Sequence, residues 1–226
     1  MNDIVYFVKE CRENEELRYS LRSLKNFPHN KVYFYGGCPD DLTPDHHIHI
    51  KQDLENKWQN VHKMLVMACN NRHISSNFWL FNDDFFVMER VEKPTNYYNG
   101  DLYKRIVQLE DSYQGITPYT KQLRIMCQEL ESMGLSTLNY ALHVPILINK
   151  NKAIELLNMT DCPMFRCLYG NFAKLKAELS SDVKIVSKEK RYKGGIYLST
   201  DDNSFNGVVG QQIKDTFPVR CKYERS

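Results

Sequence analysis

Two adjacent carboxylates, Asp83 and Asp84, interrupt one of the most apolar stretches of this sequence. A run of aromatic and aliphatic residues, followed by Asn82, precedes the pair, and apolar residues resume directly after it. Carboxylates between hydrophobic runs are costly to desolvate unless a cation meets them. A hard divalent cation with oxygen ligands, itself bridging to a diphosphate, is the simplest such partner. Because Asn and Asp also favour turns, the pattern is equally typical of a turn, with residues 81–86 as a hairpin.

The elements that must position this pair alternate between strand and helix patterns. Residues 4–8 and 31–35 are β-branched and aromatic runs typical of buried strands. Between them, Asn14 is expected to cap a helix, so the β-α-β order predicts a parallel pair with a right-handed crossover. A second helix over 56–69 leads into the strand that ends at the acidic pair. The sequence predicts an α/β fold with a mostly parallel central sheet flanked by helices, which binds ligands at the carboxyl ends of its strands.

The second half of the chain has a less regular pattern. A helix is expected over 118–133, with its apolar stripe in the core. His143 precedes a buried strand over 146–148, and helices are expected over 152–159 and 168–179.

Length and composition are those of a globular protein. Of the 226 residues, 42% are hydrophobic and 26% are charged. We expect one Rossmann-type domain over 1–226, with two halves over 1–92 and 93–226. The net charge of +2 provides no broad electrostatic footprint for nucleic acid or a membrane surface.

The cysteines and the lack of long apolar runs favour a cytoplasmic protein. Seven scattered cysteines without a CxxC pair are typical of reduced thiols rather than of disulfides or a zinc site. No apolar run approaches the ~18 residues of a transmembrane segment, and the first residues show no signal-peptide pattern.

Three further polar clusters need an interpretation. His46, His47 and His49 alternate with isoleucines, so a strand divides them between two faces, which favours a strand edge over a metal site. The stretch 196–203 runs from a strand pattern into acidic residues and forms a second strand-to-acid junction. The basic stretch 184–193 is typical of a solvated face.

Four stretches together resemble the Stealth family, the sugar-1-phosphate transferases of capsule synthesis and of lysosomal-enzyme tagging. Residues 14–24 are similar to the family's NELRYSLRS helix, and residues 56–86 resemble its largest block. An HVP triplet at His143 and an FR pair at Arg166 resemble its HxP and fR elements, and 196–203 weakly resembles its closing block. The order and rough spacing cover nearly the whole chain.

One departure from the family concerns the loop after the first strand. The family usually has WVDGSDP there, whereas residues 8–13 of this chain read VKECRE. The Asp-Gly turn is missing, so the nucleotide contacts of that loop do not carry over. The chain also resembles a minimal version without accessory domains, so the family's acceptors do not carry over either.

The resemblance implies a GT-A-like fold and a transferase that uses a nucleotide diphosphate-sugar donor with Mg²⁺ or Mn²⁺. Residues 1–92 would form its nucleotide-binding half and residues 93–226 its acceptor-binding, catalytic half. Residues carry over only where the motifs match. The expected site comprises the catalytic residues His143, Arg166 and Asp83, the nucleotide- and phosphate-binding residues Asn82, Asn56, Arg18 and Arg22, and the metal ligands Asp84, Asp83 and Asp202.

In the family's chemistry an acceptor hydroxyl attacks the sugar-bound phosphorus, so sugar-1-phosphate moves and a nucleoside monophosphate leaves. A near-neutral imidazole suits His143 to the role of general base, and a guanidinium suits Arg166 to phosphate oxygens. By themselves these two residues are typical of a strand-capping histidine and a surface arginine. A plain glycosyltransferase that attacks the anomeric carbon would use the same acids and metal.

A third interpretation is a non-catalytic module that binds nucleotide-sugars or polyanions. The basic stretch 184–193 also leaves open a polyanionic acceptor, such as a teichoic-acid-like polymer or modified DNA.

Overall fold

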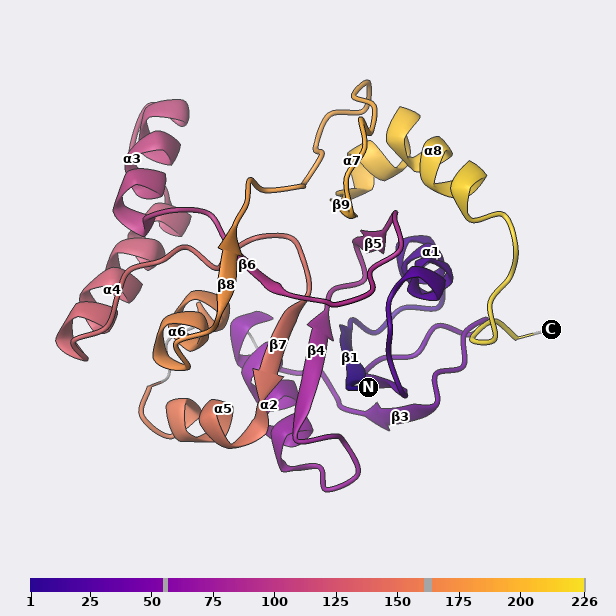
Figure 1. Ribbon diagram of the computed structural model, residues 1–226, viewed down its shortest axis with the longest axis horizontal. Helices are drawn as coiled ribbons and strands as arrows, with labels where there is room; N and C mark the ends of the chain where they lie inside the picture. The colour runs from indigo at the N-terminus through magenta and orange to yellow at the C-terminus, as the bar shows by residue number, and fades with distance from the viewer. Residues whose placement is uncertain (55–56, 161–163, 226) are drawn as a thin grey trace. The chain divides into compact units, whose positions relative to one another are not determined.

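The computed structural model describes residues 1–54, 57–160 and 164–225 (Figure 1). Internal contacts divide the chain into two compact units. Unit 1 comprises Met1–Pro94, His143–Lys150 and Val183–Ser226, and unit 2 comprises Thr95–Leu142 and Asn151–Asp182. The first boundary lies close to the expected one at residue 92, but the chain returns to unit 1 twice. The expectation of one functional domain stays a prediction.

Unit 1 is built on a five-stranded sheet in the order β3-β2-β1-β4-β7. Its strands are β1 (Asp3–Val8), β2 (Val32–Gly36), β3 (His46–His49), β4 (Asn77–Phe81) and β7 (Ile146–Asn149). The first four run parallel, and β7 is antiparallel to β4. The predicted α/β fold with a mostly parallel central sheet flanked by helices is confirmed at this level. Its assignment to the GT-A or Rossmann type stays a prediction.

The strands at the centre of this sheet have continuous apolar sequences and are buried. Tyr6 of β1, Phe34 of β2 and Phe81 of β4 are each 0% exposed. Strands that are covered on both faces require such runs, because neither face is left for polar side chains. The one buried hydroxyl among them, on Tyr6, forms a 2.9 Å hydrogen bond with Ser20 Oγ and is thereby satisfied.

The β1–β2 crossover contains helix α1 (Glu15–Ser23) and a 3₁₀ turn, η1 (Leu24–Asn26). Asn14 caps α1 as predicted, because its Oδ1 accepts a hydrogen bond from the Leu17 N–H at 2.9 Å. The second crossover helix, α2 (Lys57–Asn70), lies before β4, as expected.

Gly36 ends β2 in a conformation that only glycine adopts without strain. Its φ is +104°, and a Cβ there would lie 2.3 Å from the Val8 carbonyl oxygen. Gly36 therefore lies where the backbones of β1 and β2 approach each other closely at their carboxyl ends.

After β4 the chain turns and enters a second, smaller sheet. Here β5 (Phe85–Val87) pairs antiparallel with β9 (Tyr197–Ser199). Figure 1 shows β9 and the helices α7 (Asp202–Phe205) and α8 (Val208–Thr216) beside β5. The hairpin interpretation of residues 81–86 is wrong, because β4 and β5 belong to different sheets. The turn itself is present.

An apolar cluster holds this smaller sheet to the C-terminal helices. The cluster comprises the buried residues Phe86, Met88, Leu198, Phe205, Val209, Ile213 and Phe217. Phe86 and Phe205 stack with ring centroids 6.0 Å apart. Because β5 continues directly from the acidic turn, this packing fixes the far side of that turn.

Unit 2 contains four helices and a two-stranded parallel pair among its described residues. They are α3 (Leu102–Ser112), α4 (Pro118–Ser132), α5 (Lys150–Leu157), α6 (Phe165–Phe172), β6 (Asn96–Tyr98) and β8 (Ala177–Leu179). The α4 prediction is confirmed: Thr117 and Thr120 form a capping box, and Leu123, Met126 and Leu130 are buried.

The predicted helix over 168–179 is wrong in its second half. The helix α6 ends at Phe172, Lys174 follows with a left-handed φ of +49°, and residues 177–179 pair with β6 instead. Local periodicity did not show this end, because the competing partner strand lies about 80 residues earlier in the chain. No helix in the described ranges is long and apolar enough to cross a membrane.

Candidate functional site

The acidic pair lies on a tight turn at the carboxyl end of β4. The Phe85 N–H donates to the Asn82 carbonyl oxygen at 3.3 Å, which closes the turn around Asp83 and Asp84. The flanking strands β4 and β5 are largely buried, so they hold both carboxylates at the edge of the sheet where β4 ends. The strand-to-acid prediction and the turn prediction therefore describe the same geometry.

Asn14 connects the first acid to helix α1. Its Nδ2 donates to Asp83 Oδ2 at 2.8 Å, while its Oδ1 caps the helix at Leu17. The positive end of the α1 dipole thus faces the acidic turn. Burial raises the pKa of Asp83, and the neighbouring charge of Asp84 adds to that increase, although the Asn14 hydrogen bond opposes it.

Within the described chain, Asp84 has one carboxylate oxygen that is hydrogen-bonded and one that is not. Its Oδ2 accepts hydrogen bonds from Lys184 Nζ and from Ser199 Oγ, each at 3.0 Å. Its Oδ1 is buried and has no hydrogen-bond partner among the residues that the structure describes. Only 14% of the side chain is exposed, so water does not readily compensate that oxygen.

A third carboxylate, Glu16, lies in the electrostatic field of this pair. Thr200 Oγ1 donates to Glu16 Oε1 at 2.5 Å. Burial raises the pKa of Glu16 to about 7, and the charges of Asp83, Asp84 and Asp202 add to that increase against the Thr200 hydrogen bond. Glu16 therefore titrates near neutral pH.

Asp202 lies at the start of α7, directly after the helix cap. Asp201 supplies the cap itself, by accepting a hydrogen bond from the Ser204 N–H at 2.9 Å. Asp202 is exposed, and its negative charge contributes to the raised pKa of Glu16. The second strand-to-acid junction predicted over 196–203 thus lies beside the first.

His143 lies at the same edge of the sheet. Because β7 is antiparallel to β4, the start of β7 meets the end of β4, with Ile146 opposite Leu80. The His143 ring packs edge-on against Phe85, the residue after Asp84, with ring centroids 6.5 Å apart. His143 thus lies beside the residue that follows Asp84, and its role in the site stays a prediction.

The roles of two further predicted site residues, Arg166 and Asn56, stay predictions. Arg166 belongs to unit 2, in the first turn of α6, and its role stays a prediction. Asn56 lies outside the described residues.

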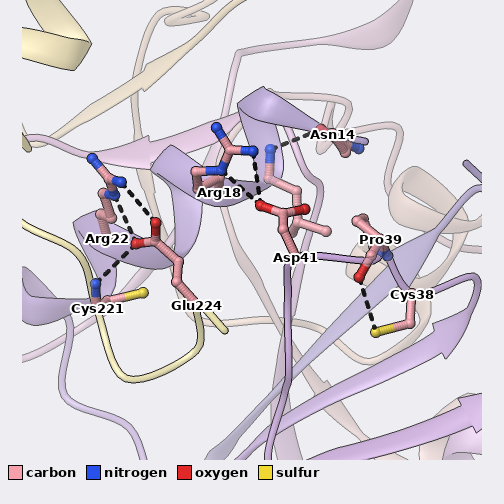
Figure 2. Close-up of polar contacts among 9 residues, drawn as sticks. Asn14, Arg18, Arg22, Cys38, Pro39, Asp41, Cys221 and Glu224 are labelled. Atoms are coloured by element: carbon pink, nitrogen blue, oxygen red, sulfur yellow. Dashed lines mark hydrogen bonds and ion pairs between the residues drawn. The ribbon is translucent and has the colours of Figure 1, made fainter. Parts of the chain in front are cut away.

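Arg18 and Arg22 lie one helical turn apart on α1, and carboxylates engage both of them (Figure 2). Arg18 forms an ion pair with Asp41, with Nη2 2.7 Å from Oδ2. Arg22 binds Glu224 through Nε and Nη2, each at 2.7 Å, and donates from Nη1 to the Phe217 carbonyl oxygen at 3.0 Å. Arg22 thus fastens the C-terminal tail to α1, and a phosphate role for either arginine stays a prediction.

The histidine strand has the predicted alternation. His47 and His49 lie on one face, with rings 6.2 Å apart, whereas His46 stacks on Tyr33. His49 pairs with Glu10 at 2.7 Å.

Within the described ranges, no three His, Cys, Asp or Glu side chains converge to hold a metal ion. A divalent ion at the acidic turn would therefore take one or both adjacent carboxylates and fill its remaining positions with water and substrate oxygens, which is the usual arrangement for Mg²⁺.

Sequence reasoning missed several contacts of the acidic turn. Lys184 had been assigned to a solvated basic face, yet it is the cation that meets Asp84. Ser199 and Thr200 bind Asp84 and Glu16, and both lie in the second strand-to-acid junction. That junction was the available signal, because two acid-rich strand ends in one α/β sheet tend to meet at its carboxyl edge.

A comparison with protein-family models found no match for this chain. A comparison with curated protein sequences found no significant relative.

Proposed function

We propose that this protein is a metal-dependent transferase that uses a nucleotide diphosphate-sugar and transfers sugar-1-phosphate to an acceptor hydroxyl. The observation that carries the proposal is Asp84: a buried carboxylate at a strand's carboxyl end, with one oxygen held by Lys184 and Ser199 and the other without a partner in the described chain. The resemblance of the surrounding motifs to the Stealth family supports the same reaction.

The donor set fits Mg²⁺ or Mn²⁺. Asp84 and Asp83 supply hard oxygen ligands, and the unpartnered Oδ1 of Asp84 is a buried acceptor that a cation would satisfy. When bound, such an ion neutralises negative charge on the phosphates of the donor. Asp202, at the adjacent junction, does not form a three-carboxylate set with this pair in the described ranges and stays a second-rank ligand candidate.

The remaining groups bind, orient and accept a proton. Asn82 borders the turn and is suited to orient a phosphate oxygen or the acidic pair. His143, at the same sheet edge, is the candidate to accept the proton of the acceptor hydroxyl at its imidazole nitrogen. Arg166 is the candidate to bind phosphate oxygens of the donor.

The reaction is tested by the nucleotide product. The purified protein is incubated with UDP-, CMP- and GDP-sugars and Mg²⁺ or Mn²⁺, and the released nucleotide is identified by mass spectrometry. Monophosphate release from a UDP- or GDP-sugar, abolished in Asp84→Asn and His143→Ala and retained in Asp215→Asn, supports phosphosugar transfer. Asp215 is a matched control because it is an exposed acid on α8.

Other outcomes of this assay would indicate a different activity for this protein. Diphosphate release would make the protein a glycosyltransferase, since attack at the anomeric carbon leaves both phosphates on the nucleotide. No turnover and no metal-dependent nucleotide binding across the panel would contradict the proposal and favour a binding module.

A further inference from the structure

An arginine-rich pocket lies in unit 1 between helix α1 and the C-terminal tail. Its volume is about 190 Å³. It is lined by Arg18, Arg22, Asp41, Arg220, Glu224 and Arg225. Figure 2 shows Arg18 and Arg22 pointing from α1 toward Asp41 and Glu224. Neither carboxylate of the acidic turn lines this pocket.

The charge of the lining is unbalanced. Four guanidinium groups face two carboxylates, an excess of two positive charges. Arg18 and Arg22 use the two carboxylates, so the excess belongs to Arg220 and Arg225. Arg225 donates from Nε to Thr43 Oγ1 at 2.8 Å, and Arg220 has no hydrogen bond or ion pair to any part of the chain that the structure describes.

The pocket is held in shape by contacts that do not use these two arginines' charges. The tail residue Glu224 is clamped by Arg22, and its side chain is only 5% exposed. The Thr43 N–H donates to the Tyr223 carbonyl oxygen at 2.8 Å, and the Arg225 N–H donates to the Asp41 carbonyl oxygen at 2.9 Å. A ligand would therefore bind to a preorganised pocket and would not have to order the C-terminal tail.

We propose that this pocket binds a dianionic phosphate group through Arg220 and Arg225. A planar guanidinium matches phosphate oxygens in pairs, and two such charges balance a dianion. The volume is below the ~300 Å³ at which pockets begin to hold drug-sized ligands, so it suits a phosphate group and not a whole nucleotide-sugar.

Neither Asp83 nor Asp84 lines this pocket, so a phosphate held by Arg220 and Arg225 is distinct from one at the acidic turn. Along α1 the lining begins at Arg18, four residues after Asn14, and reaches Arg22, eight residues after it, and eight residues of α-helix span roughly 12 Å. The inference thus goes beyond the proposed transferase and does not depend on it. The phosphate has two possible sources, free inorganic phosphate or the terminal phosphate of a larger molecule.

Calorimetric titration in EDTA, without metal or donor, tests the proposal. Inorganic phosphate is one probe and glucose 6-phosphate the other, both near pH 7.5, where a phosphate monoester with a second pKa near 6 is mainly dianionic. We expect saturable binding to the wild type and to Arg191→Ala, a loss of about tenfold or more in Arg220→Ala/Arg225→Ala, and weakening by added salt. Arg191 is an exposed arginine outside the pocket lining.

The two probes separate the sources, and a further variant separates the two proposals. Binding of phosphate but not of the ester assigns free phosphate, whereas binding of the ester assigns a phosphate-terminated molecule. Asp84→Asn should bind both probes as the wild type does, whatever the outcome of the product assay. No saturable binding of either probe, or equal affinity in the wild type and the double variant, would overturn the inference.

Discussion

Lys184 and Asp84, separated by 100 residues in the chain, meet with Nζ and Oδ2 3.0 Å apart. The ammonium group lies beside the carboxylate that we propose as a metal ligand. The ion pair offsets part of the cost of removing both charged groups from water. At the proposed metal site, Lys184 would therefore compete with a divalent cation for Asp84.

Lys184→Met should strengthen divalent metal binding. The methionine keeps much of the side-chain length but removes the competing charge, so we expect the Mn²⁺ dissociation constant to fall by about three- to tenfold, the effect of ~1 kcal/mol. The measurement is Mn²⁺ titration followed by electron paramagnetic resonance. Lys190→Met, which changes an exposed lysine of the same basic stretch, should bind as the wild type does. Weaker Mn²⁺ binding in Lys184→Met would show that Lys184 supports the metal site.

Arg22→Met should destabilise the fold. It leaves Glu224 buried without its partner, which typically costs about 3 kcal/mol or more. Urea unfolding measures the loss, and Arg191→Met, at an exposed position, should stay within about 0.5 kcal/mol of the wild type. The double variant Arg22→Met/Glu224→Leu should recover much of the loss, because no buried charge remains. An unchanged midpoint in Arg22→Met would contradict the structural role.

The ion pair between Arg22 and Glu224 makes the free energy of unfolding depend on pH in the acidic range. Burial by itself would raise the pKa of Glu224, but hydrogen bonds from Arg22 and from the Cys221 N–H outweigh it and hold the pKa below its ordinary value of 4.5. Since the pKa is depressed in the folded state, the stabilisation is present above about pH 4.5 and is lost as the pH falls below it. Urea unfolding of the wild type and of Arg22→Met should therefore converge at low pH.

Glu16 makes the free energy of unfolding depend on pH in the opposite direction. Its pKa rises from 4.5 to about 7 on folding, so between these values the folded protein binds more protons than the unfolded chain and stability falls as the pH rises. Glu16→Gln should be more stable than the wild type at about pH 8, by on the order of 1 to 2 kcal/mol after allowance for partial exposure. The two should be equal at about pH 4.5.

Urea unfolding in EDTA at the two pH values tests this prediction. Glu15→Gln is the control, because Glu15 lies in the same helical turn and pairs with Lys214 at the surface. Its change should be small and similar at both pH values. Equal effects of Glu16→Gln at both pH values would refute the expected titration.

Asn14 should show two separable contributions. Asn14→Ser keeps a helix-capping oxygen but loses the donor to Asp83, whereas Asn14→Ala loses both. We expect Asn14→Ala to be less stable than Asn14→Ser by about 1 kcal/mol, the typical cost of a lost cap. Asn14→Ser should itself be less stable than the wild type, because the buried Asp83 oxygen loses its partner. Urea unfolding of the three proteins makes the comparison, and equal stability of the two variants would mean that the cap contributes nothing.

The sequence by itself determined the elements whose formation depends on near neighbours. The apolar runs of β1, β2 and β4 predicted buried parallel strands, because an unbroken apolar segment is stable only where both faces are covered. Asn14 predicted the start of α1, because a capping side chain bonds within its own helical turn. Asp83 and Asp84 were identified because their charges contrast with their immediate surroundings.

Tertiary structure alone decided which distant groups meet these elements. Lys184 is as polar as its neighbours in a basic stretch, and its bridge to Ser199 together with the pairing of β5 with β9 brings it to Asp84. Arg22 reaches a carboxylate 202 residues away. Whether a charge is solvated or buried beside a partner depends on which segments pack together, and the chain's local pattern carries no information about that choice.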